Sequence, residues 1–302
     1  MPIRSFDEVE QFVLASGEVK TVALCGSHDD LALSALAEAK RKGIAKGILI
    51  GNAAATREIL AQIGEPEDDW EIIDEPDEMT SCNMAIAFVR EGRADACMKG
   101  LVQTSSYMRA VLNKETGILP KGHVLSETSV LEWPEQNRMV FATDCAINIS
   151  PDLDTKVKLI NNAVALAHCF EIEKPLVAAV SSLEKVNPKI ESSVDAGELA
   201  KMEWADCIVE GPFALDNAVS VEAAEHKGVH GAVAGKADVL LLPDLDAGNV
   251  LHKSAHFFAR MKMAVTVCGT DKPVILASRT DTANTKYNGI ITALLQSIKQ
   301  GA

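Results

Sequence analysis

Apolar residues in the first hundred positions follow two alternating patterns. Short continuous apolar runs that end at glycine or polar residues are typical of buried strands, and they are predicted at residues 21–25, 47–50, 70–73 and 94–98. Between them, apolar residues recur at spacings of three and four, which predicts helices at residues 29–42, 53–63 and 79–91. Strands that alternate with helices of this length predict βαβ units and a parallel sheet.

The pattern changes between residues 121 and 141. Two strand-like runs are joined there by a short loop that contains a proline, with no helix between them, which predicts a hairpin and the start of a second domain. Alternation then resumes, with strands predicted at residues 176–181, 207–210, 239–242 and 273–277 and helices at 154–170, 189–203, 216–226 and 247–263, before a last helix. We therefore expect an α/β fold whose first domain comprises residues 1–128 and 270–302, and whose second comprises residues 129–269.

Composition and charge narrow the function. Of the 302 residues, 47% are hydrophobic but only 4% are aromatic, so an aliphatic core is expected, as in helix-covered parallel sheets. The net charge of −14 argues against binding to nucleic acid or anionic membranes, which need a basic surface. No apolar run is long enough to span a membrane. The polar N-terminal stretch and seven dispersed cysteines without a CxxC pair favour reduced thiols in the cytoplasm.

Polar groups gather where predicted strands end. The strand at residues 273–277 is followed at once by Ser278, Arg279 and Asp281, in the stretch ILASRTDT. Ligands of open α/β sheets bind at the carboxyl ends of the strands. In CMKGLVQTSSYMRAVL, Lys99 and Gly100 lead into a helix whose first turn contains Thr104 and Ser105. Free N–H groups at a helix start suit a phosphate, whereas the simpler alternative is that Thr104 or Ser105 merely caps the helix.

Three other strand ends allow either a functional or a structural interpretation. In FATDCAINISPD, Cys145 has no base nearby in the sequence, which favours a buried thiol beside a capping aspartate, Asp144. In VEGPFALDNAVS, Gly211 and Pro212 would allow a ligand to approach the backbone closely, and a plain turn explains them equally well.

The third stretch is LLLPDLDAGNVLHKSAHFFA. Its Asp244 and Asp246 could hold Mg²⁺ or could cap the following helix, with Asn249 facing a ligand. His252 and His256 have the spacing of zinc ligands but lack the glutamate of HExxH, so solvated or capping histidines are the simpler expectation. No dinucleotide, P-loop or nucleophile-elbow motif occurs in the chain.

Taken together, these segments resemble a known family. MKG…TSS…R, FATDCAINISPD, VEGPFALDNAVS, ADVLLLPDLDAGNVLHKS and PVILASRTD are similar, in matching order, to the phosphate acetyltransferase and phosphate butyryltransferase family, and MKG is closer to its butyryl branch. The resemblance implies reversible transfer of a short acyl group between coenzyme A and inorganic phosphate. It also implies a two-domain, three-layer α/β/α fold with mainly parallel sheets, like isocitrate and isopropylmalate dehydrogenases, and an active site in the interdomain cleft.

The resemblance also implies site residues and partners. Ser278 and Arg279 are expected in catalysis, because arginine clamps oxyanions with two hydrogen bonds and a tetrahedral intermediate needs a positioned donor. Coenzyme A enters as a substrate, no resident cofactor or metal is expected, and the partners are acyl-CoA, phosphate, acyl phosphate and a second copy in a homodimer. The residues expected to bind phosphate or coenzyme A are Lys99, Gly100, Thr104, Ser105, Arg109, Gly211, Pro212 and Asn249.

The chain departs from the acetyl branch in two places. Thr285 stands where that branch has the aspartate proposed as the general base, so Asp281 is either the base or the N-cap of the last helix. Lys121 and His123 lie where an acetyl-branch arginine is expected. Two other functions therefore stay open: a dehydrogenase that oxidises a 2-hydroxy acid with NAD and Mg²⁺, and a coenzyme A-binding protein without catalysis.

Overall fold

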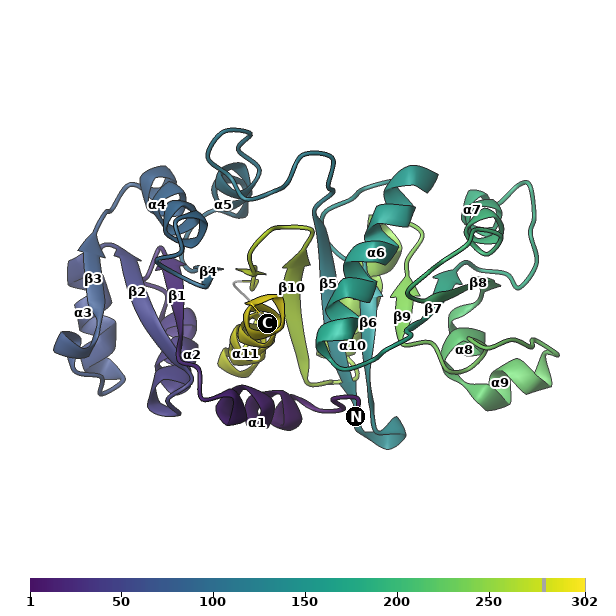
Figure 1. Ribbon diagram of the computed structural model, residues 1–302, viewed down its shortest axis with the longest axis horizontal. Coiled ribbons are helices and arrows are strands. Elements are labelled where there is room, and N and C mark those ends of the chain that lie inside the picture. Colours follow the sequence, from purple (N-terminus) through teal and green to yellow (C-terminus); the bar gives the residue numbers. More distant parts are fainter. Residues whose placement is uncertain (279–280, 302) are drawn as a thin grey trace. The chain divides into compact units, whose positions relative to one another are not determined.

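The computed structural model describes residues 1–278 and 281–301 and divides into two compact units (Figure 1). Unit 1 comprises Met1–Ser5 and Val124–Met263, and unit 2 comprises Phe6–His123 and Ala264–Ala302. The domain boundaries after residues 128 and 269, inferred from the sequence alone, stay a prediction. Among the described residues, no helix is sufficiently long and apolar to cross a membrane.

Unit 2 is built on a sheet with the strand order β3-β2-β1-β4-β11-β10. Neighbouring strands from β3 to β11 are parallel, and β10 runs antiparallel to β11. The strands are β1 (Lys20–Cys25), β2 (Ala45–Gly51), β3 (Glu71–Asp74), β4 (Ala96–Lys99), β10 (Met263–Cys268) and β11 (Val274–Ile275). Every residue of β4 and β10 is buried, as expected for strands covered on both faces.

Strand β10 was not predicted from the sequence. The apolar spacing predicted one helix over residues 247–263, whereas helix α10 ends at Phe257 and the chain turns at Arg260, which has a φ of 51°. A short apolar run that is buried on both faces shows no period, so its side chains do not distinguish a strand from the continuation of a helix. The tertiary environment makes residues 263–268 a strand.

The helices of unit 2 begin at well-defined caps. Asp29, Asn52 and Asp77 each accept a hydrogen bond from the backbone N–H three residues later, which satisfies a donor that the helix itself leaves open. The helices are α1 (Phe6–Ser16), α2 (Asp30–Arg41), α3 (Ala53–Gln62), α4 (Glu78–Arg90), α5 (Thr104–Val111) and α11 (Ala283–Gly301), with a 3₁₀ turn at Glu67–Asp69. Helix α11 packs against α1 and α2 and is buried continuously from Thr285 to Ile298.

Unit 1 has the strand order β5-β6-β9-β7-β8. Only β5 and β6 are antiparallel, joined through a 3₁₀ turn at Pro134–Gln136, so the predicted hairpin is confirmed. The strands are β5 (Ser126–Trp133), β6 (Arg138–Thr143), β7 (Leu176–Val180), β8 (Ile208–Phe213) and β9 (Val239–Leu241). The predicted α/β fold with mainly parallel sheets is therefore confirmed.

Helices cover both faces of the unit 1 sheet. Val140 and Ala142 of β6 join the apolar cluster under α8, α9 and α10, whereas Phe141 between them packs edge-on against Phe170 at the end of α6. The helices are α6 (Leu153–Cys169), α7 (Glu191–Leu199), α8 (Leu215–Val219), α9 (Val221–His226) and α10 (Leu245–Phe257). The single helix predicted over residues 216–226 is two short helices, because Ser220 is extended and caps α9.

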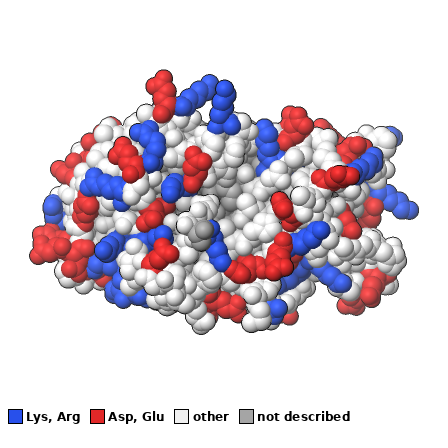
Figure 2. Space-filling model, viewed as in Figure 1, with Lys and Arg blue, Asp and Glu red and all other residues white. Residues whose placement is uncertain are grey.

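The surface carries both signs of charge. Figure 2 shows acidic and basic side chains interspersed over the face in view, with no continuous basic patch on that face. The chain holds 43 acidic and 29 basic residues. A site for an anionic substrate therefore needs cations that are held locally, and the positions of individual lysines become informative.

Candidate active site

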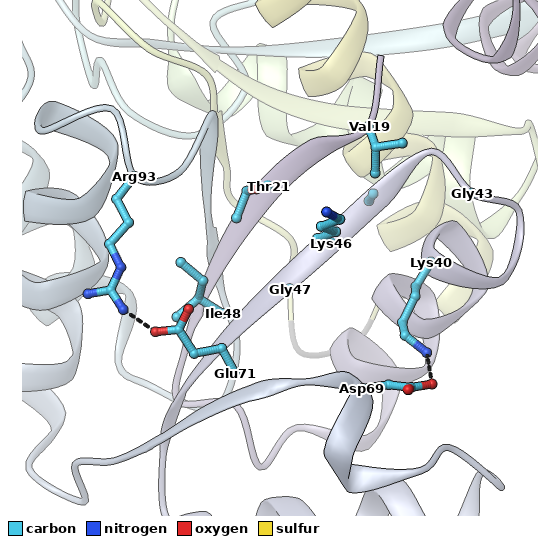
Figure 3. A pocket seen from close by; sticks show the side chains of 11 residues that line it. Val19, Thr21, Lys40, Gly43, Lys46, Gly47, Ile48, Asp69, Glu71 and Arg93 are labelled. Carbon is cyan, nitrogen blue, oxygen red and sulfur yellow. Dashed lines mark hydrogen bonds and ion pairs between the residues drawn. The ribbon is translucent and has the colours of Figure 1, made fainter. Parts of the chain in front are cut away.

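A hollow of about 570 Å³ lies at the amino ends of β1, β2 and β3 (Figure 3). Its charged side chains largely neutralise one another: Lys40 binds Asp69 at 2.9 Å, and Arg93 pairs with Glu71. None of the motifs that follow strand ends contributes to its lining. Since ligands of α/β sheets bind at the opposite, carboxyl edge, we place the candidate site there.

The carboxyl ends of β1, β4 and β11 lie at one edge of the unit 2 sheet. The last residue of β1, Cys25, is paired with Lys99 at the end of β4, and Ile275 of β11 is paired with Met98. The segments that continue from β4 and β11 therefore leave the sheet side by side. This register places Lys99 and Ser278, which lie far apart in the sequence, at the same edge.

Lys99 and Gly100 shape the loop that follows β4. Lys99 is buried, and its ammonium donates to the carbonyls of Gly100 at 3.0 Å and Val102 at 3.1 Å. A Cβ on Gly100 would lie 2.4 Å from the Gly26 carbonyl oxygen, so only glycine allows the loops after β1 and β4 to touch. Both residues thus have structural roles at the edge where we expected them to bind a ligand.

Helix α5 presents an open amino terminus. Gln103 occupies the N-cap position and makes no side-chain cap, while Thr104 and Ser105 are exposed in the first turn. The first backbone N–H groups of a helix have no partner within it, which makes this end suitable for an anion. Arg109 is exposed in the last turn. The N-cap position belongs to Gln103, so the alternative that Thr104 or Ser105 caps the helix is wrong.

The turn after β11 is held through the peptide groups of Ser278. The Asp281 carboxylate accepts a hydrogen bond from the Ser278 backbone N–H at 2.7 Å, and the Lys286 ammonium donates to the Ser278 carbonyl at 2.9 Å. Both side chains are 1% exposed. Arg279, which we expected in catalysis, lies outside the described residues.

Thr282, rather than Asp281, caps the last helix. Its hydroxyl accepts from the Thr285 backbone N–H at 3.1 Å, and its carbonyl accepts from the Lys286 N–H at 3.0 Å. The interpretation of Asp281 as an N-cap is therefore wrong, because its carboxylate turns back to Ser278. Thr285, at the position of the acetyl-branch aspartate, is buried against the Thr282 hydroxyl.

In unit 1, Asp144 closes a tight turn at the end of β6. Its buried carboxylate accepts hydrogen bonds from the backbone N–H groups of Ala146, Ile147 and Asn148 and from the Asn148 side chain at 2.6 Å. A Cβ on Gly248 would lie 2.0 Å from the Asp144 carbonyl oxygen, so α10 packs directly on this turn. Sequence reasoning named Asp144 only as a cap and missed Gly248, which the motif AGN contains.

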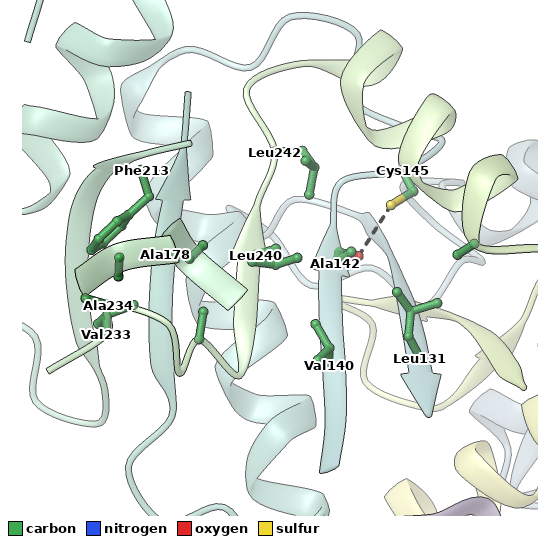
Figure 4. Close-up of a cluster of buried hydrophobic side chains, with 14 of the residues drawn as sticks. Leu131, Val140, Ala142, Cys145, Ala178, Phe213, Val233, Ala234, Leu240 and Leu242 are labelled. Carbon is green, nitrogen blue, oxygen red and sulfur yellow. Dashed lines mark hydrogen bonds between the residues drawn. The ribbon is translucent and has the colours of Figure 1, made fainter. Parts of the chain in front are cut away.

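The Cys145 thiol is structural. It is buried in the unit 1 cluster and bonds the Ala142 carbonyl at 3.5 Å (Figure 4). Burial raises its pKa well above the ordinary value, and burial raises the pKa of Cys97 beside β11 to about 12. A thiol that stays protonated is a poor nucleophile, so the expectation of a buried, unreactive Cys145 is confirmed.

The other residues of unit 1 that we expected in the site either hold the fold together or lie exposed on the surface. Gly211 and Pro212 lie inside β8 rather than in a turn, and a Cβ on Gly211 would lie 2.9 Å from Ala179 of β7, so the turn interpretation is wrong. Asn249 is exposed on α10. Asp244 accepts from the Ala247 N–H at 2.9 Å and is the N-cap of α10.

The two histidines of α10 have different surroundings. His252 is buried, with Nδ1 2.8 Å from the Ser129 hydroxyl, so the expectation of a solvated or capping residue is wrong for it. His256, one turn later, lies against the ring of Phe257. Across residues 1–278 and 281–301, no group of three or more histidine, cysteine, aspartate or glutamate side chains is arranged to hold a metal ion.

With this geometry in place, comparison with known proteins identifies the family. Residues 69–294, which include the motifs after β4, β6, β8, β9 and β11, match the family described as "Phosphate acetyl/butaryl transferase". The chain belongs to this family.

Two curated relatives and one solved structure support the assignment. A phosphate butyryltransferase of Clostridium acetobutylicum is 42% identical, over 97% of this chain and 98% of that protein. A phosphate acetyltransferase of Thermotoga maritima is 37% identical, over 92% of this chain and 95% of that protein. The crystal structure of a branched-chain phosphotransacylase from Enterococcus faecalis V583 has a TM-score of 0.83 at 30% identity, covering 92% of this chain and 99% of that one.

Lys286 is a residue of this phosphate acetyl/butyryl transferase family member that sequence reasoning passed over. Lys286 lies on the same face of α11 as Ile290 and Leu294, at spacings of four, and is the one basic residue in that stripe. The sequence alone could have drawn attention to Lys286, because a lysine is unusual on the buried, apolar face of a helix. Its partner, the Ser278 carbonyl, was not visible without the fold.

Proposed function

We propose that this protein transfers a short acyl group reversibly between coenzyme A and inorganic phosphate. The proposal rests on one observation above others: the Ser278 turn, held by two buried charged side chains, lies beside the Lys99–Gly100 loop at the carboxyl edge of the unit 2 sheet. Two segments of the family's motifs, the one after β4 and the one after β11, thus leave the unit 2 sheet at its carboxyl edge, where ligands of α/β sheets bind, and this supports the proposal. Coenzyme A is a substrate in this proposal, and no resident cofactor or metal takes part.

The reaction is a direct displacement. A phosphate oxygen attacks the thioester carbonyl carbon, a C–O bond forms, and a tetrahedral intermediate carries the negative charge on its oxygen. When the intermediate collapses, the C–S bond breaks, and the coenzyme A thiolate leaves and takes up the proton that the attacking phosphate has lost. No covalent enzyme intermediate is needed. In this scheme Arg279 clamps phosphate with two hydrogen bonds, and the Ser278 hydroxyl donates to the developing oxyanion.

We assign the proton transfer to Asp281. In the direction from acyl phosphate, the coenzyme A thiol must lose a proton before it attacks, because the thiolate is the nucleophile. Asp281 is a buried carboxylate directly in the Ser278 turn, and Thr282 rather than Asp281 caps the following helix. The hydrogen bond from the Ser278 N–H fixes the orientation of this carboxylate, as general-base catalysis requires.

The function is tested by thiol release. Purified protein is mixed with butyryl-CoA or acetyl-CoA, with and without inorganic phosphate, and free thiol is measured over time. We expect release that depends on phosphate and is unaffected by EDTA. Thiol release without phosphate, or none with any short acyl-CoA, would refute the proposal. A series of chain lengths compared by kcat/KM then defines the acyl group, because one methylene changes selectivity by only about 1–3 kcal/mol.

We also propose a cytoplasmic homodimer. Val250, Phe257 and Phe258 on and after α10 are 65%, 56% and 88% exposed, and large apolar side chains grouped in this way favour burial against a second copy. All seven cysteines are free thiols, which supports a reducing compartment. Light scattering tests the dimer: a mass near 32.3 kDa at micromolar concentration would refute it.

A further inference from the structure

Lys286 is a buried cation on the last helix, α11. Its side chain begins in the first turn of α11 and is 1% exposed. Among residues 1–278 and 281–301, its ammonium has one hydrogen-bond acceptor, the Ser278 carbonyl at 2.9 Å, and no carboxylate lies within 4.0 Å of it. An ammonium has three donors and a full positive charge, so one neutral carbonyl leaves most of its capacity unused.

Such an arrangement is unfavourable for stability alone. A buried charge is normally paired with an opposite charge, because removing it from water costs several kcal/mol. If Lys286 only had to hold the Ser278 carbonyl, an uncharged donor would do so at a lower desolvation cost. The positive charge of Lys286 is explained if an anion binds next to its ammonium and pairs with it.

The Ser278 turn limits what else could bind that anion. The Ser278 backbone N–H is already bound to the Asp281 carboxylate, so in this arrangement it does not donate to a substrate oxygen. A carboxylate in the turn also repels an incoming anion, and a neighbouring cation offsets that repulsion. Lys286 reaches the same peptide segment from α11 and is placed to provide it.

We propose that Lys286 binds inorganic phosphate at the Ser278 turn and supplies the counter-charge that allows this anion to approach Asp281. The inference rests on the acyl transfer proposed above and adds to it a phosphate ligand that the strand-end motifs did not indicate. It also accounts for a lysine one turn before Ile290 on the buried face of α11.

Two substitutions separate charge from packing. Lys286→Met keeps the length of the side chain and removes charge and donor, whereas Lys286→Gln keeps a donor for the Ser278 carbonyl and removes only the charge. In both variants we expect the KM for phosphate to rise about 10- to 100-fold, the range for losing a hydrogen bond to a charged group. The KM for acyl-CoA should change less than about threefold, and the midpoint of urea unfolding should stay the same or rise, because an under-paired buried charge is gone.

Phosphate binding is measured separately by thermal unfolding without acyl-CoA. Inorganic phosphate should raise the Tm of the unsubstituted protein, compared with chloride at the same ionic strength, and should not raise the Tm of either Lys286 variant. Thr292→Val serves as the matched control, because Thr292 is fully buried two turns further along α11. The control should keep both the phosphate KM and the phosphate-dependent rise in Tm.

The outcomes distinguish this inference from the function on which it rests. Variants that are less stable but keep the phosphate KM would show that Lys286 is a structural clamp, and the inference would be wrong. A protein whose Tm does not respond to phosphate would also overturn it. If phosphate stabilises the unsubstituted protein and not the variants, while no acyl-CoA is turned over, the phosphate site stands and the acyltransferase function fails.

Discussion

The backbone N–H of Ser278 donates to the carboxylate of Asp281, three positions later in the chain, at 2.7 Å. The carbonyl of the same serine accepts from Lys286 at 2.9 Å, so both polar backbone groups of Ser278 are bound by buried charged side chains. Two contacts of this kind hold Ser278 in one position, and a fixed position is what a catalytic residue needs.

Replacing Asp281 should separate proton transfer from turn geometry. Asp281→Asn keeps an acceptor for the Ser278 N–H but cannot take up a proton, so kcat from acyl phosphate and coenzyme A should fall about 10²–10⁴-fold and the rising limb of its pH profile should flatten. The free energy of unfolding should fall by no more than about 1–2 kcal/mol. Asp281→Ala should in addition destabilise the protein by about 1–3 kcal/mol, since it leaves the N–H without its acceptor. Near-normal kcat for Asp281→Asn would remove Asp281 as the base.

Arg279 should not tolerate a change to lysine. If it clamps phosphate with two parallel hydrogen bonds, Arg279→Lys keeps the charge but loses the planar fork and its orientation. Loss of such a contact in the transition state lowers the rate about 10²–10³-fold, equivalent to about 2.7–4 kcal/mol. Steady-state kinetics with varied phosphate provide the measurement. A variant with unchanged kcat/KM for phosphate would indicate a surface ion pair instead.

Gly100 should resist even the smallest side chain. Because a Cβ there would lie 2.4 Å from the Gly26 carbonyl oxygen, Gly100→Ala must push apart the loops that follow β1 and β4. Overpacking of this kind destabilises proteins by about 1–3 kcal/mol, and the displaced loop carries the start of α5. Chemical denaturation should show this loss together with a higher KM. Gly301→Ala is the control, since that position has open space around it, and it should change stability by less than about 0.5 kcal/mol.

Glu10 should make unit 2 sensitive to acid. Burial acts to raise its pKa, but hydrogen bonds from Lys42 at 2.8 Å and Tyr287 at 2.7 Å outweigh burial and leave the pKa below its ordinary value of 4.5. The ionised form therefore favours folding, and its contribution is complete above pH 4.5 and is lost as the pH falls through the folded-state pKa. Glu10→Gln should cost about 0.5–1 kcal/mol at pH 7 and progressively less toward pH 3, as followed by urea unfolding. A pH-independent difference would contradict this.

Asp244 should matter for stability rather than for a metal. Its carboxylate caps α10 through the Ala247 N–H, so Asp244→Ala should lower the free energy of unfolding by about 0.5–2 kcal/mol. Dialysis against EDTA should leave thiol release unchanged, and added Mg²⁺ should not raise it. Loss of activity with EDTA, restored by Mg²⁺, would instead favour the metal- and NAD-dependent dehydrogenase.

The sequence by itself determined the elements that carry local signals. Helix starts were predicted within one or two residues at Asp29, Asn52 and Asp77, because a capping side chain acts on backbone groups only three residues away. The hairpin of β5 and β6 was predictable for the same reason, since its strands lie close together in the sequence. The order of the strand-end motifs was likewise sufficient to indicate the family.

Only the tertiary structure decided what depends on distant parts of the chain. Residues 263–268 form β10, which is buried throughout and pairs with β11, and Gly211 lies within β8, where it packs closely against Ala179 of β7. The pairing of β4 with β11 brings Lys99 near the Ser278 turn across some 180 positions of sequence. Hydrogen bonds and burial act over a few ångströms of space, and no local pattern records which distant residues will share that space. For this reason Lys286 was visible in the sequence as an exception to an apolar stripe, and its relation to Ser278 was visible only in the fold.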